Sequence, residues 1–385
     1  MIWIFLPILA ASLKVDQSKD LTKIAFGSCA NQFGNDNPDL YKSIQNLNPD
    51  LFIWLGDIIY SDVLVFHPPF FKTRDPEATR KMYQNFKNNT EYKALTEKTM
   101  ITGIWDDHDY GINNGDKHFP LKDAYKELFL EFIDEKDNIN RTSHKGIYIS
   151  FSFGNNGKTV KLILLDNRYF NEKDVDILGE EQWKWLENQL KTPGDITLIA
   201  SGIQVYTEDR FGKAERWDEY SRNKLLSLIN DISGVILLTG DVHMAEILKI
   251  TCNDNLFYEV TSSGMTHTIT TTGGNLILLY LYGWLPFTFN VGHRVTVKNF
   301  GFIEIDWQFR LLKMSIRNSY GNILIEEKIS LDHFSSNFER SYYCDKKPRY
   351  RKIVHVLSFW AVFYVPLLLL GIDTLIFFRK WSHSY

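Results

Sequence analysis

The sequence predicts an α/β fold, in which helices wrap a β-sheet. Short apolar runs rich in Ile, Leu, Val and Phe recur along the chain, and stretches with apolar residues at helical spacing separate them. Four of these runs end in a polar motif, which is how an open α/β sheet builds a site at the carboxyl ends of its strands. With 385 residues, 44% of them hydrophobic, the chain can bury a large core.

The four runs that end in polar motifs are the central strands of this prediction. They cover residues 23–26, 51–55, 100–104 and 235–238. The motifs that follow them are Phe-Gly-Ser-Cys (26–29), Gly-Asp-Ile-Ile-Tyr (56–60), Trp-Asp-Asp-His-Asp (105–109) and Thr-Gly-Asp-Val-His (239–243).

The remaining elements alternate between the two types. Helices are expected over residues 38–47, 76–99, 121–134, 179–190 and 217–232, and further strands over 160–165, 196–201, 257–260, 301–307, 311–317 and 322–329. A turn at 319–322 suits a hairpin. Residues 67–76, rich in Pro and Phe, predict a long loop, and the apolar run 275–291, which contains Pro286, predicts a buried or membrane-grazing loop.

Both ends of the chain suggest a membrane. Residues 1–12 are apolar and end in small residues, as a signal peptide does, with a buried first strand as the alternative. Residues 353–378 are apolar all round and long enough to cross a bilayer, and basic and aromatic residues flank them. The predicted organisation is a signal peptide (1–12), one catalytic domain (13–345), a basic linker (346–352), a transmembrane helix (353–378) and a short tail (379–385).

The orientation of this single-pass protein depends on the signal peptide. Basic residues are more numerous before the span than after it, which alone would put the body in the cytosol. A cleaved signal peptide overrides that count and places the body outside the cell or in a lumen. Two sequons, at Asn88 and Asn140, agree with a glycoprotein. Cys252 and Cys344 could form a disulfide there, or remain free thiols.

Charge narrows the class of partner. The chain has a formal charge of −4, and a cluster of five basic residues lies at 346–352, so the body before the linker is more acidic than the whole. Nucleic-acid binding requires a basic surface, and we therefore expect no nucleic-acid partner. An acidic body is compatible with a site that recruits divalent cations.

The four motifs supply metal ligands of several kinds. Asp57 could bridge two cations, Tyr60 would suit a ferric centre, and the Cys29 thiolate favours iron or zinc over magnesium or calcium. Asp241 and His243 are two residues apart, and an extended segment would place both on the same side. Asp107 could bind a metal while His108 moves protons. Each motif alone is also common as a strand-end turn or, for Cys29, as a packed thiol.

Together with Leu-Asp-Asn-Arg (165–168), the four motifs resemble those of the PhoD-like (alkaline phosphatase D) metallophosphatases. These are relatives of the calcineurin-like phosphoesterases and the purple acid phosphatases. The resemblance runs from about residue 23 to about residue 329. It implies a four-layer αββα sandwich of the metallophosphoesterase type, with a centre of two or three metals at one sheet edge. Iron with calcium is the expected set, with zinc or manganese as alternatives.

The resemblance also implies roles for individual residues. His108 would give a proton to the leaving oxygen, and Arg168 would grip the phosphate with its fork of donors. The implied metal ligands are Cys29, Asp57, Tyr60, Asp107, Asp241 and His243.

Two departures from the family pattern matter. The superfamily usually has a histidine or asparagine ligand after a mid-chain strand, where this chain offers Gln204. Bacterial members often carry an N-terminal β-sandwich domain, for which this chain has no room. His267 matches a family stretch near the site and is a further candidate.

The sequence therefore predicts a membrane-anchored, metal-dependent phosphoesterase acting on phosphomonoesters, phosphodiesters or both. The anchor would make lipid or cell-surface phosphodiesters reachable substrates. The alternative is a catalytically silent ectodomain of the same fold that binds a partner. A hydrolase using Cys29 as nucleophile lacks a base at an obvious spacing.

Overall fold

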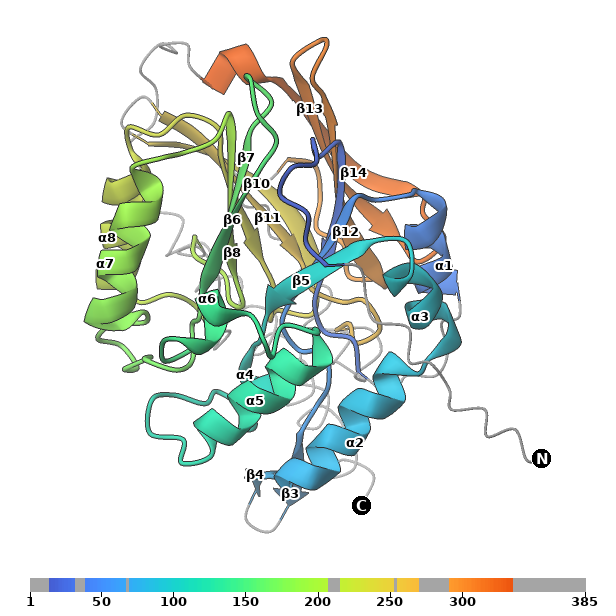
Figure 1. The fold of residues 1–385 in the computed structure, drawn as a ribbon, viewed down its shortest axis with the longest axis vertical. Coiled ribbons are helices and arrows are strands. Elements are labelled where there is room, and N and C mark those ends of the chain that lie inside the picture. Colours follow the sequence, from blue (N-terminus) through green and yellow to red (C-terminus); the bar gives the residue numbers. More distant parts are fainter. Residues whose placement is uncertain are drawn as a thin grey trace, which may run out of the picture.

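The computed structural model describes residues 14–31, 39–66, 69–206, 215–252, 255–269 and 291–334, whose strands form two large sheets and one hairpin (Figure 1). The first sheet contains β1 (Lys23–Gly27), β2 (Leu51–Leu55), β5 (Met100–Ile104), β12 (Asn299–Asp306), β13 (Leu311–Asn318) and β14 (Ile323–Ser330). The second contains β6 (Ile149–Phe153), β7 (Val160–Leu164), β8 (Ile196–Ser201), β9 (Val235–Thr239), β10 (Ala245–Cys252) and β11 (Asn255–Ser262). The hairpin consists of β3 (Asp62–Phe66) and β4 (Pro69–Thr73).

The helices complete a mixed α/β fold, as predicted. The longer ones are α1 (Asp39–Asn46), α2 (Pro76–Lys87), α3 (Thr90–Thr96), α5 (Lys122–Phe132), α7 (Gly179–Leu190) and α8 (Glu219–Ile229). The short ones are α4 (Asp107–Tyr110), α6 (Ile139–Thr142) and the 3₁₀ turn η1 (Leu331–Phe334).

The two sheets pack face to face, and helices cover their outer sides. The strand order is β14-β13-β12-β1-β2-β5 in the first sheet and β10-β11-β9-β8-β7-β6 in the second. Ile303 of the first sheet and Leu162 and Ile247 of the second belong to one buried cluster. Helices α7 and α8 lie on one side of the molecule, and α1 and α3 lie on the other (Figure 1).

Each helix packs because its apolar residues share one face. In α7, Trp183, Leu186 and Leu190 are buried at spacings of three and four residues, and they join a cluster with Leu237 of β9. On the other side, Trp54 of β2 donates its indole N–H to the Tyr92 hydroxyl at 3.1 Å.

Parallel pairing brings the carboxyl ends of several strands to the same edge of each sheet. β1, β2 and β5 are mutually parallel in the first sheet, and β7, β8, β9 and β11 are parallel in the second. A bridge between Ser28 and Ser263 joins the ends of β1 and β11, so the two edges meet. The polar motifs follow these strand ends.

Most of the predicted elements agree with the structure, with three differences. The predicted helix over 76–99 is two helices, because Asn89 accepts from the amides of Glu91 and Tyr92 and caps a new helix. The predicted loop over 67–76 is wrong, since β4 pairs with β3 along its length. Strands β3, β6 and β10 and the short helices α4 and α6 were not predicted.

Several predictions fall outside the described residues. These are the signal peptide (1–12), the linker (346–352), the transmembrane helix (353–378), the tail (379–385), Cys344 and nearly all of the apolar run 275–291. Among the helices that the structure does describe, none has the length and apolarity needed to cross a membrane.

Candidate metal centre

The first two strand ends place Cys29 beside Asp57. The Cys29 amide donates to the Gly56 carbonyl at 3.3 Å, and the Cys29 thiol lies 3.4 Å from Asp57 Oδ2. Gly56 is required here, because a Cβ on it would lie 2.4 Å from Asp106 Cβ. Burial raises the pKa of the Cys29 thiol to about 12.

Four of the predicted site residues have a left-handed backbone. The φ angles are 59° for Cys29, 52° for Asp57, 69° for Asp241 and 56° for His243. Residues other than glycine seldom adopt this region, and such strain gathers at functional sites. The turns that follow β1, β2 and β9 therefore have a strained backbone that positions these side chains.

The motif after β5 forms the short helix α4, which carries Asp107 and Asp109. Asp109 accepts from the amides of Ile58 and Ile59 at 3.0 and 3.1 Å, and from the Tyr83 hydroxyl at 3.0 Å. It thus holds the loop that carries Asp57. Burial tends to raise the pKa of Asp107, but the positive charges of His108 and Arg168 outweigh it and bring that pKa to about 2.

His108 is fixed by a carboxylate that the sequence motifs do not include. Its Nδ1 lies 2.7 Å from Asp62 Oδ1, and its Nε2 lies 4.0 Å from Asp107 Oδ1. Burial tends to lower the pKa of His108, but Asp107 and Asp62 outweigh it and raise the pKa to about 9. The Tyr60 ring packs on the imidazole with centroids 4.2 Å apart.

The turn after β9 brings Asp241 and His243 to the same place. Gly240 lets this turn approach β1 closely, since a Cβ on it would lie 2.5 Å from Ser28 Oγ. His243 Nδ1 lies 3.0 Å from the His267 carbonyl oxygen. This contact leaves Nε2 of His243 as the ring nitrogen that could bind a metal. The two histidine rings are 4.2 Å apart, so His267 is also part of the site.

These side chains form two overlapping sets of metal-ligand spacing. Among the described residues, Asp57, Asp107 and His108 offer ligand atoms within 4.8 Å of one another, and so do Asp106, Asp107 and Asp241. Asp107 belongs to both sets. Asp106 was missing from the sequence prediction, although it stands in the same motif.

The electrostatics of the cluster favour a bound cation. Burial raises the pKa of Asp57, Asp106 and Asp241 well above the ordinary value, and neighbouring acidic groups add to the effect. Asp106 Oδ2 and His267 Nδ1 are buried with no hydrogen-bond partner among the described residues. Carboxylates, an imidazole and a thiol that crowd together in this way fit a metal centre.

Arg168 lies next to the cluster but is engaged by carboxylates. It is fully buried, its Nε donates to Asp106 at 2.6 Å, and its Nη1 donates to Glu215 at 2.8 Å. The predicted grip on phosphate would require the half-buried Glu215 to release it. In this structure the positive charge of Arg168 offsets part of the negative charge of Asp106.

Gln204 points into a different polar network. Its side-chain amide donates to Glu246 at 3.0 Å and to Thr261 at 2.7 Å, and all three residues are buried. An amide nitrogen that donates twice in this way holds two buried acceptors in place. This bonding favours a structural role over the predicted one as a ligand.

One family model and two solved structures are similar to this chain. The family model described as PhoD-like phosphatase matches residues 24–277, more than half of the chain. A solved structure of PhoD is similar with a TM-score of 0.59 at 17% identity, over 82% of this chain and 69% of that chain. A crystal structure of TT1561 from Thermus thermophilus has a TM-score of 0.37 at 11% identity, over 78% of this chain and 99% of that one. No curated protein matches the chain significantly.

Proposed function

Because the chain belongs to the PhoD-like phosphatase family, we propose that it is a metal-dependent phosphoesterase with its active centre at the ends of β1, β2, β5 and β9. The family supports the reaction class and a phosphate-ester substrate. The observation that carries the location is that Asp107 has ligand atoms close to Asp57 and also to Asp106 and Asp241. Two cations sharing a carboxylate is an arrangement suited to phosphoryl transfer.

The proposed ligands differ little from those expected from the sequence. They are Cys29, Asp57, Tyr60, Asp107, Asp241 and His243, together with His267, which was a further candidate from the sequence and lies beside His243. Asp106 is added from the geometry. When bound, the cations would supply the Lewis acidity that activates the attacking water and offsets charge on the phosphoryl group. The thiol and the phenol among the donors favour iron at one position, and the carboxylates suit calcium beside it, with zinc or manganese as the alternative.

The chain's own residues handle the proton. Asp62 holds His108 through Nδ1, so the other ring nitrogen, Nε2, is the one that faces the acidic cluster. We assign to His108 the donation of a proton to the leaving alcohol oxygen. Arg168 keeps Asp106 and Glu215 in position by its two ion pairs.

We further propose the setting of this enzyme. The two packed sheets and their outer helices are interpreted as the αββα sandwich of metallophosphoesterases. A signal peptide at 1–12 and an anchor at 353–378 would hold the domain at a membrane, on the extracellular or luminal side. Lipid or cell-surface phosphodiesters would then be within reach. Protease treatment of intact microsomes tests the orientation: a luminal body is protected, and digestion of the body without detergent would contradict the proposal.

Chelation tests the proposed chemistry. The full chain in detergent is assayed with 4-nitrophenyl phosphate and bis(4-nitrophenyl) phosphate, and its metal content is measured by elemental analysis. Turnover is expected to disappear with the metal and to return when the same metal is added back. Unchanged turnover in protein proven metal-free would overturn the metal mechanism. Absence of turnover with every metal would support the silent ectodomain.

The same assay addresses the ester class. Faster hydrolysis of the diester would support a phosphodiesterase, and equal rates would leave that preference without support.

A further inference from the structure

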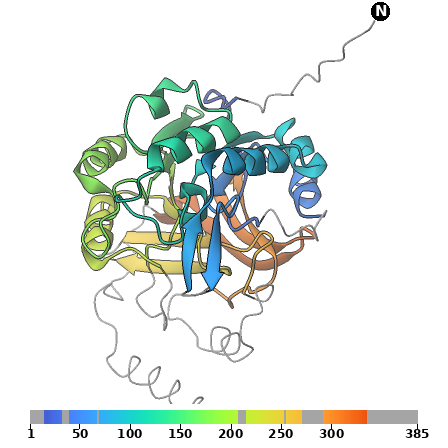
Figure 2. The same ribbon diagram turned by 90° about the horizontal axis from the view of Figure 1, so that it is seen from below.

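The hairpin β3–β4 connects directly to the proposed proton donor. Its first residue, Asp62, lies 2.7 Å from His108 Nδ1, and the ring of Phe71 lies 6.1 Å from the His108 ring. The hairpin is at the bottom of the molecule in Figure 1 and near the centre of the view from below in Figure 2. The hairpin therefore packs directly against His108.

The strand register shows which side chains lie on the face of the hairpin that meets His108. Asp62 pairs with Thr73, and Leu64 pairs with Phe71. Paired residues in an antiparallel ladder point to the same face, and alternate residues along a strand return to it. Asp62, Leu64, Phe71 and Thr73 thus share the face that contacts His108.

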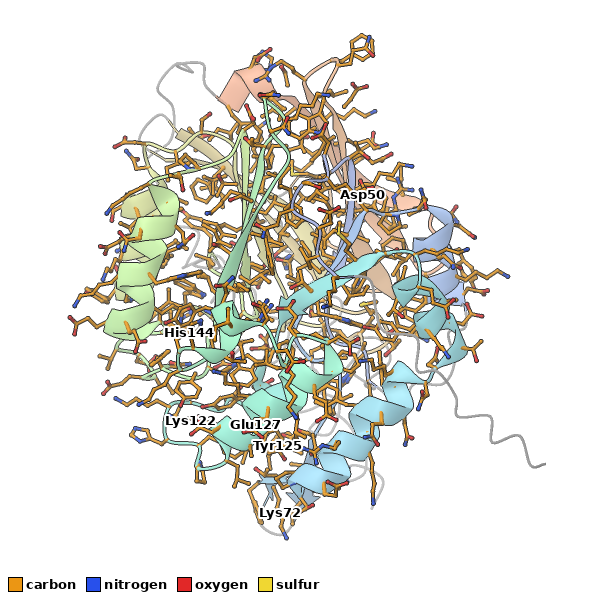
Figure 3. The ribbon with its side chains drawn as sticks, in the orientation of Figure 1. Asp50, Lys72, Lys122, Tyr125, Glu127 and His144 are labelled. Carbon is orange, nitrogen blue, oxygen red and sulfur yellow. The ribbon has the colours of Figure 1, made fainter. Side chains whose placement is uncertain are left out.

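The opposite face carries Val63, Val65, Phe70 and Lys72, by the same register. Lys72, labelled at the bottom of Figure 3, is on this face and not on the one that meets His108. Both faces of the hairpin are therefore largely apolar, but only the face of Leu64 and Phe71 meets His108.

Leu64 and Phe71 are available to a ligand. Leu64 is 43% exposed, and Phe71 is half-buried. A two-stranded hairpin has no core of its own, and apolar groups left at such a surface next to a site commonly bind ligands. The only charged group on this face among the described hairpin residues is Asp62, which His108 already engages.

We propose that the Leu64–Phe71 face binds the apolar part of the leaving alcohol, so that preferred substrates are phosphoric esters of alkyl or aryl alcohols. The inference rests on the proposed function, because it uses His108 as the donor to the leaving oxygen. Hydrolysis breaks the phosphorus–oxygen bond to that alcohol, water supplies the new bond, and the alcohol takes the proton of His108. An alcohol leaving from beside His108 would extend along this face.

Alkyl phosphates of different length test the inference. Ethyl and octyl phosphate have leaving groups of similar basicity, so their rates differ through binding of the chain. Used below the concentration at which micelles form, octyl phosphate should show a kcat/KM at least about tenfold higher with the native protein. Leu64→Ser should remove most of this difference.

Phe70→Ser is the matched control, because Phe70 is 48% exposed on the opposite face of the same hairpin. It should leave the preference for octyl phosphate intact. Octylphosphonate, which cannot be hydrolysed, should inhibit the native protein more strongly than ethylphosphonate, and Leu64→Ser should narrow that gap.

The outcomes separate this inference from the proposed function. Equal kcat/KM for the two esters would overturn the inference while leaving the phosphoesterase in place. A loss of the preference that is as large in Phe70→Ser would also overturn it, since it would indicate general adsorption to an apolar hairpin. No hydrolysis of either ester or of 4-nitrophenyl phosphate would overturn the proposed function, and the inference with it.

Discussion

Strand β2 has an aspartate at each end, and the two behave in opposite ways. At the amino end, Asp50 accepts from the amides of Thr22 and Lys23 at 2.7 and 2.9 Å and pairs with Lys19 at 2.8 Å. Burial raises the pKa of Asp50, but these partners outweigh it and lower the pKa. At the carboxyl end, burial raises the pKa of Asp57 well above normal, and Cys29 and Asp107 raise it further.

The second sheet repeats the contrast. Asp195, just before β8, accepts from the backbone amide and the hydroxyl of Thr159 at 2.8 and 2.6 Å, and these bonds lower its pKa in spite of burial. Asp241, just after β9, has a raised pKa because of burial and of Asp106. Carboxylates at the amino ends are satisfied by donors of the chain, whereas those at the carboxyl ends face one another. Figure 3 labels Asp50 in the upper part of the molecule, away from the hairpin residue Lys72 at the bottom.

Buried charge alone therefore does not mark a site. Both ends of β2 hold a shielded carboxylate, but only one end leaves it among other acids. Such an arrangement costs stability in the absence of a cation, and a protein tolerates it where function requires it.

The largest effect is expected from Asp57→Asn. Changes to groups that merely orient ligands already cost about 10–100-fold in activity or affinity, so loss of a carboxylate ligand itself should cost more than about 100-fold in kcat/KM. The chelated protein should become more stable by about 1 kcal/mol, because a buried charge among acids is gone. Enzyme assays and thermal unfolding measure these two effects, and elemental analysis shows whether the variant keeps its metal. A variant that keeps its metal and its rate would contradict the functional interpretation of this end.

Asp62→Asn comes next, and it tests the orientation of His108. The substitution keeps an oxygen that can accept from the Asn113 amide, which bonds Asp62 at 2.8 Å, but removes the charge beside His108. We expect kcat to fall about 10–100-fold for an alkyl phosphate. The fall should be smaller for 4-nitrophenyl phosphate, since its leaving group needs less protonation. Equal losses for both esters would argue that Asp62 acts only on the fold.

Much of the fold could be predicted from the sequence because the central strands are continuous apolar runs. The predicted bounds of β2, β5, β8 and α7 agree with the structure. In β6, apolar and polar residues alternate, and β10 contains polar residues such as Glu246. Neither strand is therefore a continuous apolar run. The hairpin was missed because Pro69 suggested a loop, whereas proline is tolerated at the start of a strand.

The candidate site was predictable in part, for a related reason. The motifs at strand ends converge because the strands are parallel, so Cys29, Asp57, Asp107 and Asp241 could be grouped without coordinates. Asp62 and Glu215 could not, because their partners, His108 and Arg168, are far away in sequence. Gln204 was chosen from its position after β8, but the direction of its side chain depends on tertiary contacts with Glu246 and Thr261.

Gln204→Ala tests whether Gln204 has a structural role or is a metal ligand. If Gln204 is structural, the free energy of unfolding should fall by about 1–3 kcal/mol, because buried Glu246 and Thr261 would lose a donor. Metal content should stay the same. The measurement is denaturant unfolding of the chelated protein beside elemental analysis of the native one. Loss of metal with unchanged stability would instead identify Gln204 as a ligand.

The smallest effect is expected from Asp50→Asn, which acts at the opposite end of β2. Removing the charge should cost about 1 kcal/mol at pH 7 and leave activity unchanged, because the lost hydrogen bonds and ion pair serve only the fold. The folded pKa of Asp50 lies below the ordinary value of 3.8, so its contribution is present above that pH. It is lost as the pH falls through the lower, folded pKa.

The stability difference between the native protein and Asp50→Asn should therefore shrink in acid, as followed by denaturant unfolding from pH 7 to pH 3. Asp20→Asn is the control, because Asp20 pairs with Lys158 at 3.6 Å between exposed side chains, and such a pair contributes less than about 1 kcal/mol. A difference that persists unchanged in acid would mean that Asp50 does not act through its charge. A loss of phosphatase activity would mean that the two ends of β2 are coupled, and the contrast between them would no longer separate structure from function.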